Sequence, residues 1–322
     1  MTQKSCSPVL KWVGGKRQLL PILRLCINAY TEKANIEQFS YHEPFFGGGA
    51  LFFDLISKQK IKKSYINDIN RELIIFYETI KSDENSDKLL KKILLMEKQF
   101  SESKARDTLF TNWKERFNLL INKSSKDQNL SNSEKVEISA LLLSLNKTCF
   151  NGVYRKNKKG QFNVPFGKKM TEVVNFLDVE NYKNVNSALQ DSKLTNISFE
   201  SAINFQKIKN NHLVFIDPPY IPISKTAQFK GYYDDGFSMD QHYLLAQKIN
   251  EIDSKGAYFI LTNSNTELVK DIYLTKKNYS LSKVSVARSI NQMGRDDSEF
   301  GIKEILITNF KVKIPQQLNL GI

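Results

Sequence analysis

The chain has 322 residues and carries 47 Lys and Arg against 34 Asp and Glu, which gives a formal net charge of +13. Its 41% apolar and 25% charged residues are an ordinary globular composition, which excludes disorder and collagen-like repeats. No apolar run approaches the roughly 18 residues of a membrane span, and the first residues lack the layout of a signal peptide, so a cytoplasmic location is expected. The positive excess favours a polyanionic partner.

Apolar, strand-like segments alternate with helical patterns along much of the chain. Strands are predicted at residues 40–46, 61–66, 212–216 and 257–261, and helices follow the first two. This alternation indicates an α/β fold with a mostly parallel sheet covered on both faces. Each strand ends in a short signature: EPFFGGG at 43–49, NDIN at 67–70, DPPY at 217–220 and TNSN at 262–265. Such sheets bind ligands outside the carboxyl ends of their strands, where all of these signatures lie.

The character of the chain changes between about residues 76 and 175. Residues 86–121 are rich in Lys and predict helix, with an apolar face formed by Leu89, Leu90, Ile93, Leu94 and Leu95. A polar run at 122–132 predicts a surface loop, and residues 136–145 return to a helical pattern. Because this stretch interrupts the α/β alternation, we interpret it as an inserted, mainly helical subdomain.

Two basic segments are candidates for contact with nucleic acid. Residues 146–171 hold seven Lys or Arg and no acid, interleaved with Phe150, Tyr154, Phe162 and Phe166. Basic residues neutralise phosphates and aromatic rings stack on bases or wedge between them, although a solvated basic hairpin is the alternative. Residues 283–295, followed by a strand at 304–308, predict a second hairpin with Arg288 and Arg295 near its loop. An edge strand protected by its charges is the alternative there.

Cysteine and histidine usage excludes several chemistries. Cys6, Cys26 and Cys149 are odd in number and far apart, which indicates neither a disulfide framework nor a zinc knuckle. The three histidines are isolated from one another in sequence, without metal-ligand spacing. The nucleophile-elbow pattern G-x-S-x-G is absent. We therefore expect no metal site and no Ser-His-Asp triad.

The glycine turn that follows the first strand is a candidate ligand site. Three glycines before a helix let backbone N–H groups approach a ligand at the helix N-terminus. Asp68, at the end of the next strand, is placed to accept hydrogen bonds from ribose hydroxyls. The spacing fits adenosine-type ligands in general, so NAD, FAD and S-adenosylmethionine remain open. A glycine-rich turn with a helix-capping Asp is the structural alternative.

The string DPPY at residues 217–220 is the more specific signal. Its prolines fix φ and end the strand, so that Asp217 and Tyr220 are held rigidly where the strand stops. A carboxylate and a backbone carbonyl that accept from an exocyclic amine would make its nitrogen more tetrahedral and more nucleophilic. An aromatic ring supplies a wall for a flipped-out base. These residues suit the alkylation of a base amine, which needs no strong general base.

Taken together and in order, these motifs resemble the Dam-type DNA adenine methyltransferases, which transfer a methyl group from S-adenosylmethionine to N6 of adenine. The resemblance covers nearly the whole chain, including KWVGGK at 11–16, the segment 151–167 and RSI at 288–290. It implies a Rossmann-like methyltransferase sheet with an inserted target-recognition subdomain. The catalytic, S-adenosylmethionine-binding domain is expected at 1–75 and 176–322, and the DNA target-recognition subdomain at 76–175.

The resemblance also assigns roles to matching positions. Asp217 and Pro218 would polarise the amine, Tyr220 would stack on the extruded base, and Pro219 completes the catalytic motif. Lys11 and Arg155 would read base edges. The residues expected to contact the cofactor are Trp12, Lys16, Glu43, Pro44, Phe45, Gly47, Gly49, Asp68 and Asp217. The residues expected to contact DNA are Lys11, Asn151, Arg155, Asn157, Lys158, Asn163 and Arg288.

The expected activity is therefore the methylation of adenine in duplex DNA by a monomer. Relatives of this branch commonly recognise GATC, so GATC is the hypothesis for the target site. An N4-cytosine DNA methyltransferase uses the same amine chemistry and stays open. A protein-glutamine methyltransferase usually begins the motif with Asn, and a non-catalytic DNA-binding relative would not need Trp12, Lys16, Asp68 and Asp217. A restriction–modification, solitary or phage role is equally compatible with the sequence.

Overall fold

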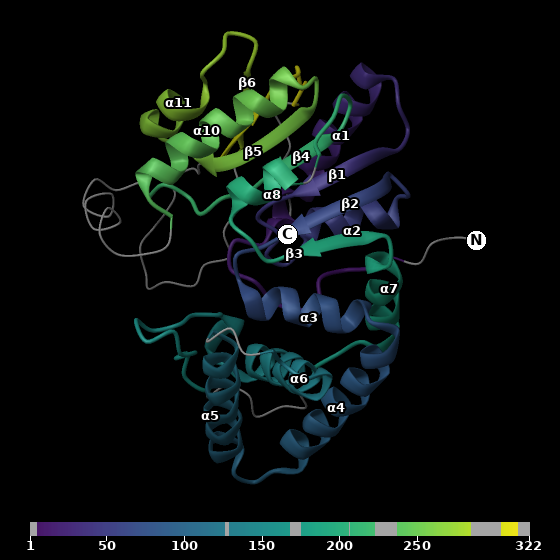
Figure 1. The fold of residues 1–322 in the computed structure, drawn as a ribbon, viewed down its shortest axis with the longest axis vertical. Helices are drawn as coiled ribbons and strands as arrows, with labels where there is room; N and C mark the ends of the chain where they lie inside the picture. Colours follow the sequence, from purple (N-terminus) through teal and green to yellow (C-terminus); the bar gives the residue numbers. More distant parts are fainter. Residues whose placement is uncertain are drawn as a thin grey trace. The chain divides into compact units, whose positions relative to one another are not determined.

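The computed structural model describes residues 5–125, 129–167, 175–205, 207–222, 237–284 and 304–314 (Figure 1). Contacts divide the chain into two compact units. The first comprises Met1–Gly15, Gly47–Gln59 and Asp68–Asn196, and the second comprises Lys16–Phe46, Lys60–Asn67 and Ile197–Ile322. The predicted division into a catalytic domain at 1–75 and 176–322 and an inserted subdomain at 76–175 stays a prediction.

The second unit carries most of the sheet. Its strands follow the order β2-β1-β4-β5-β7-β6, whereas β3 (Ser192–Thr195) belongs to the first unit. The bounds are β1 Phe39–Glu43, β2 Ile61–Asn67, β4 Leu213–Ile216, β5 Tyr258–Ser264, β6 Ser280–Val284 and β7 Glu304–Thr308. The β2–β1, β1–β4 and β4–β5 pairs are parallel, whereas β7 is antiparallel to both β5 and β6. The predicted α/β fold with a mostly parallel sheet is confirmed.

Helices cover this sheet on both faces. The alternate side chains Val214, Ile216, Phe259 and Leu261 belong to one apolar cluster. That cluster also contains residues of α8 (Phe199–Phe205), α10 (Met239–Ser254) and α11 (Glu267–Tyr273). On the opposite face, Tyr30 of α1 (Leu20–Ala34) packs against Phe39 and Tyr258, which explains why these strands are apolar on both sides. Figure 1 shows α10 and α11 alongside β5.

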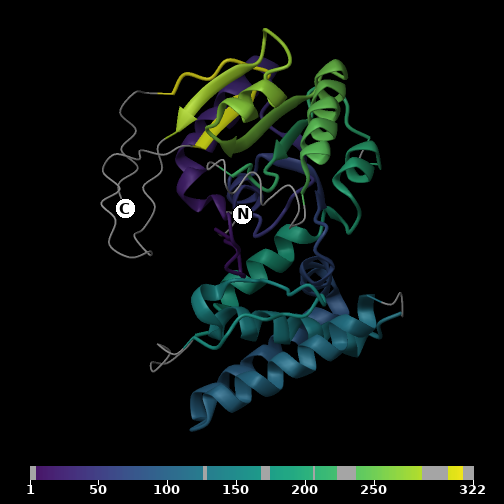
Figure 2. The ribbon, with the colours of Figure 1, turned by 90° about the vertical axis from the view of Figure 1, so that its left-hand side faces the viewer.

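Helices dominate the first unit. They are α2 (Ala50–Ser57), α3 (Arg71–Lys81), α4 (Asp83–Glu102), α5 (Arg106–Ser125), α6 (Asn132–Thr148) and α7 (Val179–Leu189). Helix α6 contacts α3, α4 and α5, and almost every residue from Val136 to Leu145 is buried. A helix that is apolar on all sides has to lie inside a bundle. Figure 2 shows the long helices α4 and α5 of this unit from the side.

Several sequence-based expectations are wrong in detail. Residues 86–121 are helical as predicted and lie in α4 and α5, but α5 continues to Ser125, inside the predicted loop. Leu94 and Leu95 are 39% and 56% exposed, because helical spacing from Leu89 and Ile93 leads to Met96 and Phe100, the buried residues of α4. Strand β5 extends beyond Leu261 through the buried polar residues 262–264.

Membrane spans and metal sites can be assessed for the described residues only. Within the ranges given above, no helix combines the length and apolarity that crossing a membrane requires. In the same ranges, His, Cys, Asp and Glu form no group of three or more that could hold a metal ion.

Candidate cofactor and active site

The glycine turn in the first unit is shaped by Asp68. One carboxylate oxygen of Asp68 accepts a hydrogen bond of 2.8 Å from the backbone N–H of Gly47, and the other accepts one of 2.8 Å from Asn70 N–H. Burial raises the pKa of Asp68, while these two N–H donors oppose the shift. Gly47 and Gly49 have φ of +52° and +70°, a left-handed conformation that only glycine adopts readily. Gly49 is the residue before α2, so the turn opens onto the N-terminus of that helix.

Trp12 lies against this turn. A Cβ atom on Gly47 would come within 3.0 Å of Trp12 Cδ1, and one on Gly48 within 3.3 Å of Trp12 Cβ. The indole also stacks on Tyr154, with ring centroids 5.2 Å apart and an angle of 19° between planes. The glycines are therefore needed for close packing as well as for backbone conformation. Trp12 and Tyr154 join the glycine turn to the basic segment 146–167 within one unit.

Glu72 of α3 holds part of the basic segment in place. Its Oε2 accepts a hydrogen bond of 3.0 Å from Tyr154 Oη and forms an ion pair of 2.7 Å with Lys156 Nζ. Burial, together with the charge of Glu72, raises the pKa of Tyr154 strongly, so its hydroxyl remains a donor. Lys156, counted among the basic residues of this segment, thus has a protein partner. Of the four aromatic residues, Phe150 is the exposed one, at 56%.

Lys11 is brought next to the same segment. Asn146 of α6 accepts from Lys11 N–H at 2.9 Å and donates to Lys11 O at 2.8 Å. The same Asn146 amide donates to Gly152 O at 2.9 Å. The side chain of Lys11 passes over Gly152, where a Cβ atom would lie 2.7 Å from Lys11 Cδ. Lys11 therefore lies against Gly152, the residue after Asn151. Lys11 and Asn151 are both among the residues expected to contact DNA.

The rest of the segment is a narrow hairpin. Isolated bridges pair Cys149 with Phe166 and Lys156 with Phe162. Arg155 is exposed, and its Nε donates to Asn163 Oδ1 at 2.9 Å. Asn157 Oδ1 accepts from the N–H groups of residues 159 and 161, so this side chain shapes the turn. Lys158 is exposed at the same turn, whereas Arg288, like Arg295, lies outside the described residues.

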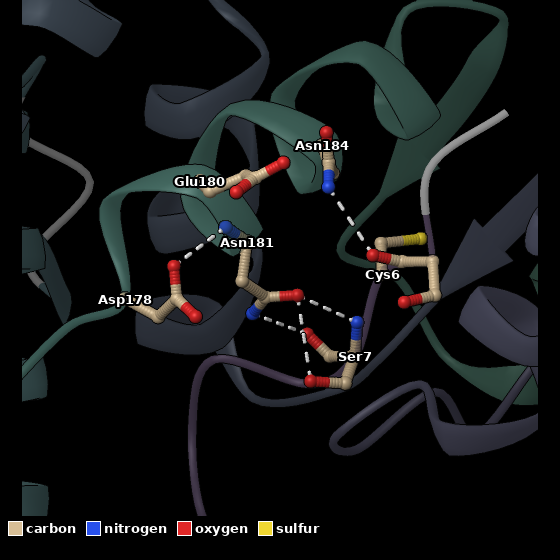
Figure 3. Close-up of a pocket in the computed structure, with 7 residues that line it drawn as sticks. Cys6, Ser7, Asp178, Glu180, Asn181 and Asn184 are labelled. Carbon is tan, nitrogen blue, oxygen red and sulfur yellow. Dashed lines mark hydrogen bonds between the residues drawn. The ribbon is translucent and has the colours of Figure 1, made fainter.

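A polar pocket in the first unit lies apart from these residues. It has a volume of about 500 Å³ and is lined by Ser5, Cys6, Ser7, Asp178, Glu180, Asn181 and Asn184 (Figure 3). Asn181 accepts from Ser7 N–H at 2.8 Å and donates to Ser7 O at 3.0 Å. Asn184 donates to Ser5 O at 3.2 Å. These bonds fix the segment that leads to Lys11 and Trp12 onto α7.

In the second unit, Asn67 shapes the turn at residues 43–46. The buried Asn67 amide donates to Pro44 O at 3.1 Å, and Asn67 O accepts from Phe46 N–H at 3.0 Å. Glu43 is buried and accepts a hydrogen bond of 2.8 Å from Tyr41 Oη. Phe45 packs against the rings of Phe199 and Phe237. The expected cofactor residues Glu43, Pro44 and Phe45 are thus held by the sheet and by α8.

Asp217, directly after β4, is the centre of a buried polar cluster. Its Oδ2 is 2.8 Å from Lys16 Nζ, and the two side chains are 17% and 9% exposed. Its Oδ1 accepts a hydrogen bond of 2.5 Å from Thr262 Oγ1 on β5. Burial raises the pKa of Asp217, whereas the charge of Lys16 and the bonds from Lys16 and Thr262 lower it. The structure therefore brings together the predicted residues Lys16 and Asp217.

Tyr220 completes this cluster. Lys16 Nζ lies 4.7 Å from the centre of the Tyr220 ring, within the range of a cation–π interaction. The hydroxyl of Tyr220 donates to Glu304 Oε2 on β7 at 2.8 Å. Burial and the charges of Asp217 and Glu304 raise the pKa of Tyr220, so it stays protonated. Between the two ends of the motif, Pro218 is buried and Pro219 is exposed.

Sequence reasoning missed three residues of these clusters. Asn67 and Thr262 stand inside the strand-end signatures NDIN and TNSN, but neither was predicted to have a role. Their signal is a polar side chain at the carboxyl end of an apolar strand. Glu304 carries a weaker signal, because it is the first residue of its strand rather than the last.

Comparison with known proteins agrees with the geometry. Residues 12–290 match the family described as D12 class N6 adenine-specific DNA methyltransferase. The chain is 34% identical over 306 residues to the type II methyltransferase M.MjaIII of Methanocaldococcus jannaschii, which covers 94% of this chain and 99% of that protein. It is also 34% identical over 305 residues to the type II methyltransferase M1.LlaDCHI of Lactococcus lactis subsp. cremoris, covering 94% and 95%. The DNA adenine methylase of Vibrio cholerae is 26% identical over 286 residues, covering 88% and 90%.

The match includes the glycine turn, the hairpin that carries Arg155 and the cluster around Asp217. The resemblance to Dam-type adenine methyltransferases expected from the motifs is confirmed. The chain belongs to the D12 class N6 adenine-specific DNA methyltransferase family.

Proposed function

We propose that this protein transfers a methyl group from S-adenosyl-L-methionine to N6 of an adenine flipped out of duplex DNA. The single observation that carries the proposal is the buried cluster of Lys16, Asp217 and Tyr220 at the end of β4. It combines an ionised acceptor with an aromatic ring, which is what an exocyclic amine on a planar base requires.

The residues of the glycine turn fit an adenosine-type cofactor. Asp68 uses each carboxylate oxygen for one backbone N–H, and a carboxylate has lone pairs left for ribose hydroxyls. The turn lacks side chains, and Trp12 provides an apolar wall beside it. We assign Trp12, Gly47, Gly49 and Asp68 to the adenosine, and Lys16, Glu43, Pro44, Phe45 and Asp217 to the remainder of the cofactor. When bound, S-adenosylmethionine supplies a methyl group activated by its sulfonium.

The chain's own residues prepare the nucleophile. The Asp217 carboxylate and the Pro218 carbonyl accept hydrogen bonds from the N–H groups of the target amine and so raise the nucleophilicity of its nitrogen. Lys16 favours the ionised form of Asp217, because the ammonium offsets part of the cost of burying the charge. Tyr220 stacks on the base. A strong base is unnecessary, since the amine proton becomes acidic once the methyl group has been transferred.

Residues of the first unit support the proposed DNA partner and target site. Arg155 is exposed and steadied by Asn163, an arrangement that suits a bidentate contact with guanine. We propose GATC as the target, read in part by Arg155 and Lys11, with Asn151, Asn157, Lys158, Asn163 and Arg288 as further contacts. The protein would act on double-stranded DNA as a monomer in the cytoplasm, in a restriction–modification system, as a solitary enzyme or in a phage.

Replacement of Asp217 by Ala tests the mechanism. We expect methyl transfer to fall at least about 1,000-fold, because the amine loses its carboxylate acceptor. Duplex DNA binding should largely survive. The matched control is Asp240→Ala, which removes an exposed carboxylate from the first turn of α10. Incorporation of labelled methyl groups and a DNA-binding titration measure both effects, and unchanged turnover of the Asp217 variant would overturn the mechanism.

Product analysis separates the proposal from its alternative. Nucleosides from DNA treated with the enzyme should contain N6-methyladenine, and N4-methylcytosine as the sole product would sink the adenine assignment. Sequencing the methylome of a host that lacks adenine methylation, after expression of the protein, identifies the site. Methylation outside GATC would reject that part of the proposal alone.

A further inference from the structure

The antiparallel strand β7 places the carboxylate of Glu304 beside the carboxyl-terminal ends of the parallel strands. Glu304, the first residue of β7, pairs in register with Ser264, the last residue of β5. In a parallel strand, a first residue would lie at the opposite edge. The reversal of β7 therefore places Glu304 at the end of the sheet where Asp217 and Tyr220 follow β4.

Tyr220 is held at its two ends by different strands. The backbone that follows it is fixed by β5, since Asn263 accepts from Ile221 N–H at 3.2 Å and Ser264 donates to Ile221 O at 2.6 Å. The hydroxyl at the far end of the ring is fixed by Glu304 on β7, at 2.8 Å. With the backbone and the hydroxyl both anchored, the ring retains little freedom to tilt.

We propose that Glu304 is a positioning residue that fixes the plane of the Tyr220 ring for stacking on the target adenine. This inference rests on the proposed function, which assigns the stacking to Tyr220. Glu304 acts through the tyrosine hydroxyl. A carboxylate is a strong acceptor for this bond, and Tyr220 remains a donor because it stays protonated.

The first test compares Glu304→Ala with Glu304→Gln, which keeps an acceptor at the same place. We expect Glu304→Ala to lower kcat about tenfold, the rate equivalent of one lost hydrogen bond, with a smaller change in the KM for DNA. Glu304→Gln should recover most of this loss. Glu267→Ala, which removes an exposed carboxylate from α11, is the matched control and should match the wild type. Equal losses in the Ala and Gln variants would show that the charge matters rather than the acceptor, and would overturn the inference.

The second test makes the effect depend on the tyrosine hydroxyl. In a Tyr220→Phe background the hydroxyl is absent, so Glu304→Ala should have no further effect on kcat. A duplex with 2-aminopurine at the target adenine reports the stacking directly. In time-resolved fluorescence, the fraction of bound probe in the short-lived, ring-stacked state should fall in Glu304→Ala and return in Glu304→Gln. An undiminished effect of Glu304→Ala in the Tyr220→Phe background would overturn the inference, as would an unchanged stacked fraction.

The outcomes distinguish this inference from the function on which it rests. Thermal unfolding of each variant establishes that it is folded. If Glu304→Ala does not fold, Tyr220→Phe, which removes the hydroxyl bonded to Glu304, should show the same loss of kcat, and a wild-type kcat in that variant would overturn the inference. A wild-type enzyme that makes N6-methyladenine, together with a Glu304→Ala variant of wild-type kcat, removes the inference and leaves the proposed function intact. A wild-type enzyme that makes no N6-methyladenine removes both.

Discussion

The buried carboxylate of Asp217 at the end of β4 has two neighbours that oppose the effect of burial on its pKa. Burial favours the neutral form of Asp217, and Lys16 at 2.8 Å and Thr262 at 2.5 Å favour the ionised form. The ionised form is the one that accepts hydrogen bonds from an amine. Lys16 therefore shifts the balance between the two protonation states of Asp217 toward the ionised form.

Lys16→Met tests this dependence. Without the ammonium the pKa of Asp217 rises further, so a larger fraction is protonated and inactive at low pH. We expect the acid limb of the kcat profile, measured at saturating cofactor, to move to higher pH by about one unit or more, which is tenfold in rate on that limb. Lys270→Met, which removes the partner of the exposed Glu267, is the control. An acid limb at the wild-type position would show that Lys16 does not set the ionisation of Asp217.

At the scale of elements, the hairpin at 146–167 is fixed by contacts that its composition does not reveal. Its aromatic and basic residues divide between two tasks: Tyr154 and Lys156 bind Glu72, whereas Phe150 and Arg155 are exposed. Lys11 is held at its base by Asn146 and Gly152. The hairpin is therefore a shaped surface, and the glycine under Lys11 is part of that shape.

Two glycines in this hairpin make a matched pair for substitution. Gly152 and Gly160 both have left-handed backbones, with φ of +65° and +74°, so Ala costs each about 1–2 kcal/mol of folding free energy. A Cβ at Gly152 would also meet Lys11 Cδ at 2.7 Å and Asn146 O at 3.2 Å, whereas nothing lies within 4 Å at Gly160. Gly152→Ala should therefore lose about 1–3 kcal/mol more than Gly160→Ala in urea unfolding, and should bind duplex DNA more weakly. Equal losses would mean that Lys11 yields freely and is not restrained by this contact.

At the scale of the whole molecule, stability should depend on a buried histidine. His242 of α10 is 3% exposed and shares a hydrogen bond of 2.7 Å between Nδ1 and Tyr273 Oη. Burial lowers its pKa to about 4. In the unfolded chain this histidine has an ordinary pKa of about 6.5. Between about pH 6.5 and pH 4 the unfolded chain therefore binds a proton at His242 that the folded protein does not bind.

The lowered pKa of His242 makes the folded protein less stable as the pH falls. His242 is neutral in both states above about pH 6.5, and the folded protein loses stability as the pH falls from there to about 4, by about 3 kcal/mol from this group. Urea unfolding at pH 7 and pH 4.5 measures the loss. Carboxylates titrate over the same range, so the comparison is with His242→Gln, whose stability should fall less steeply with acid. Identical slopes in the two proteins would contradict the lowered pKa.

The parts of the molecule that sequence predicts well are those set by local pattern. Continuous apolar runs identified β4 and β5, and strand-like segments that precede a turn signature identified β1 and β2. The rule that ligands bind at carboxyl ends points to Asp68, Asp217 and Tyr220, whose roles stay predictions. That rule considers only the last residues of strands and therefore does not point to Glu304, the first residue of β7. Only the pairing of the strands reveals that β7 is antiparallel to β5. Leu94 and Leu95 were misplaced for a related reason. A run of apolar residues does not determine which of them faces the bundle. Helix α4 packs against α6, and Leu89 and Ile93 are the leucine and isoleucine of this run that become fully buried.

The position of β7 has a consequence for the order in which the molecule is assembled. Within the sheet, β7 lies between β5 and β6, although it is the last of the described strands to be synthesised. During translation β6 is made first and has to wait, because its pairing partner is β7. A nascent chain that has not yet reached residue 304 therefore leaves the edge of β5 open and the Tyr220 hydroxyl without Glu304. Closure of the sheet and formation of the hydrogen bond between Tyr220 and Glu304 therefore depend on the same late pairing of β7.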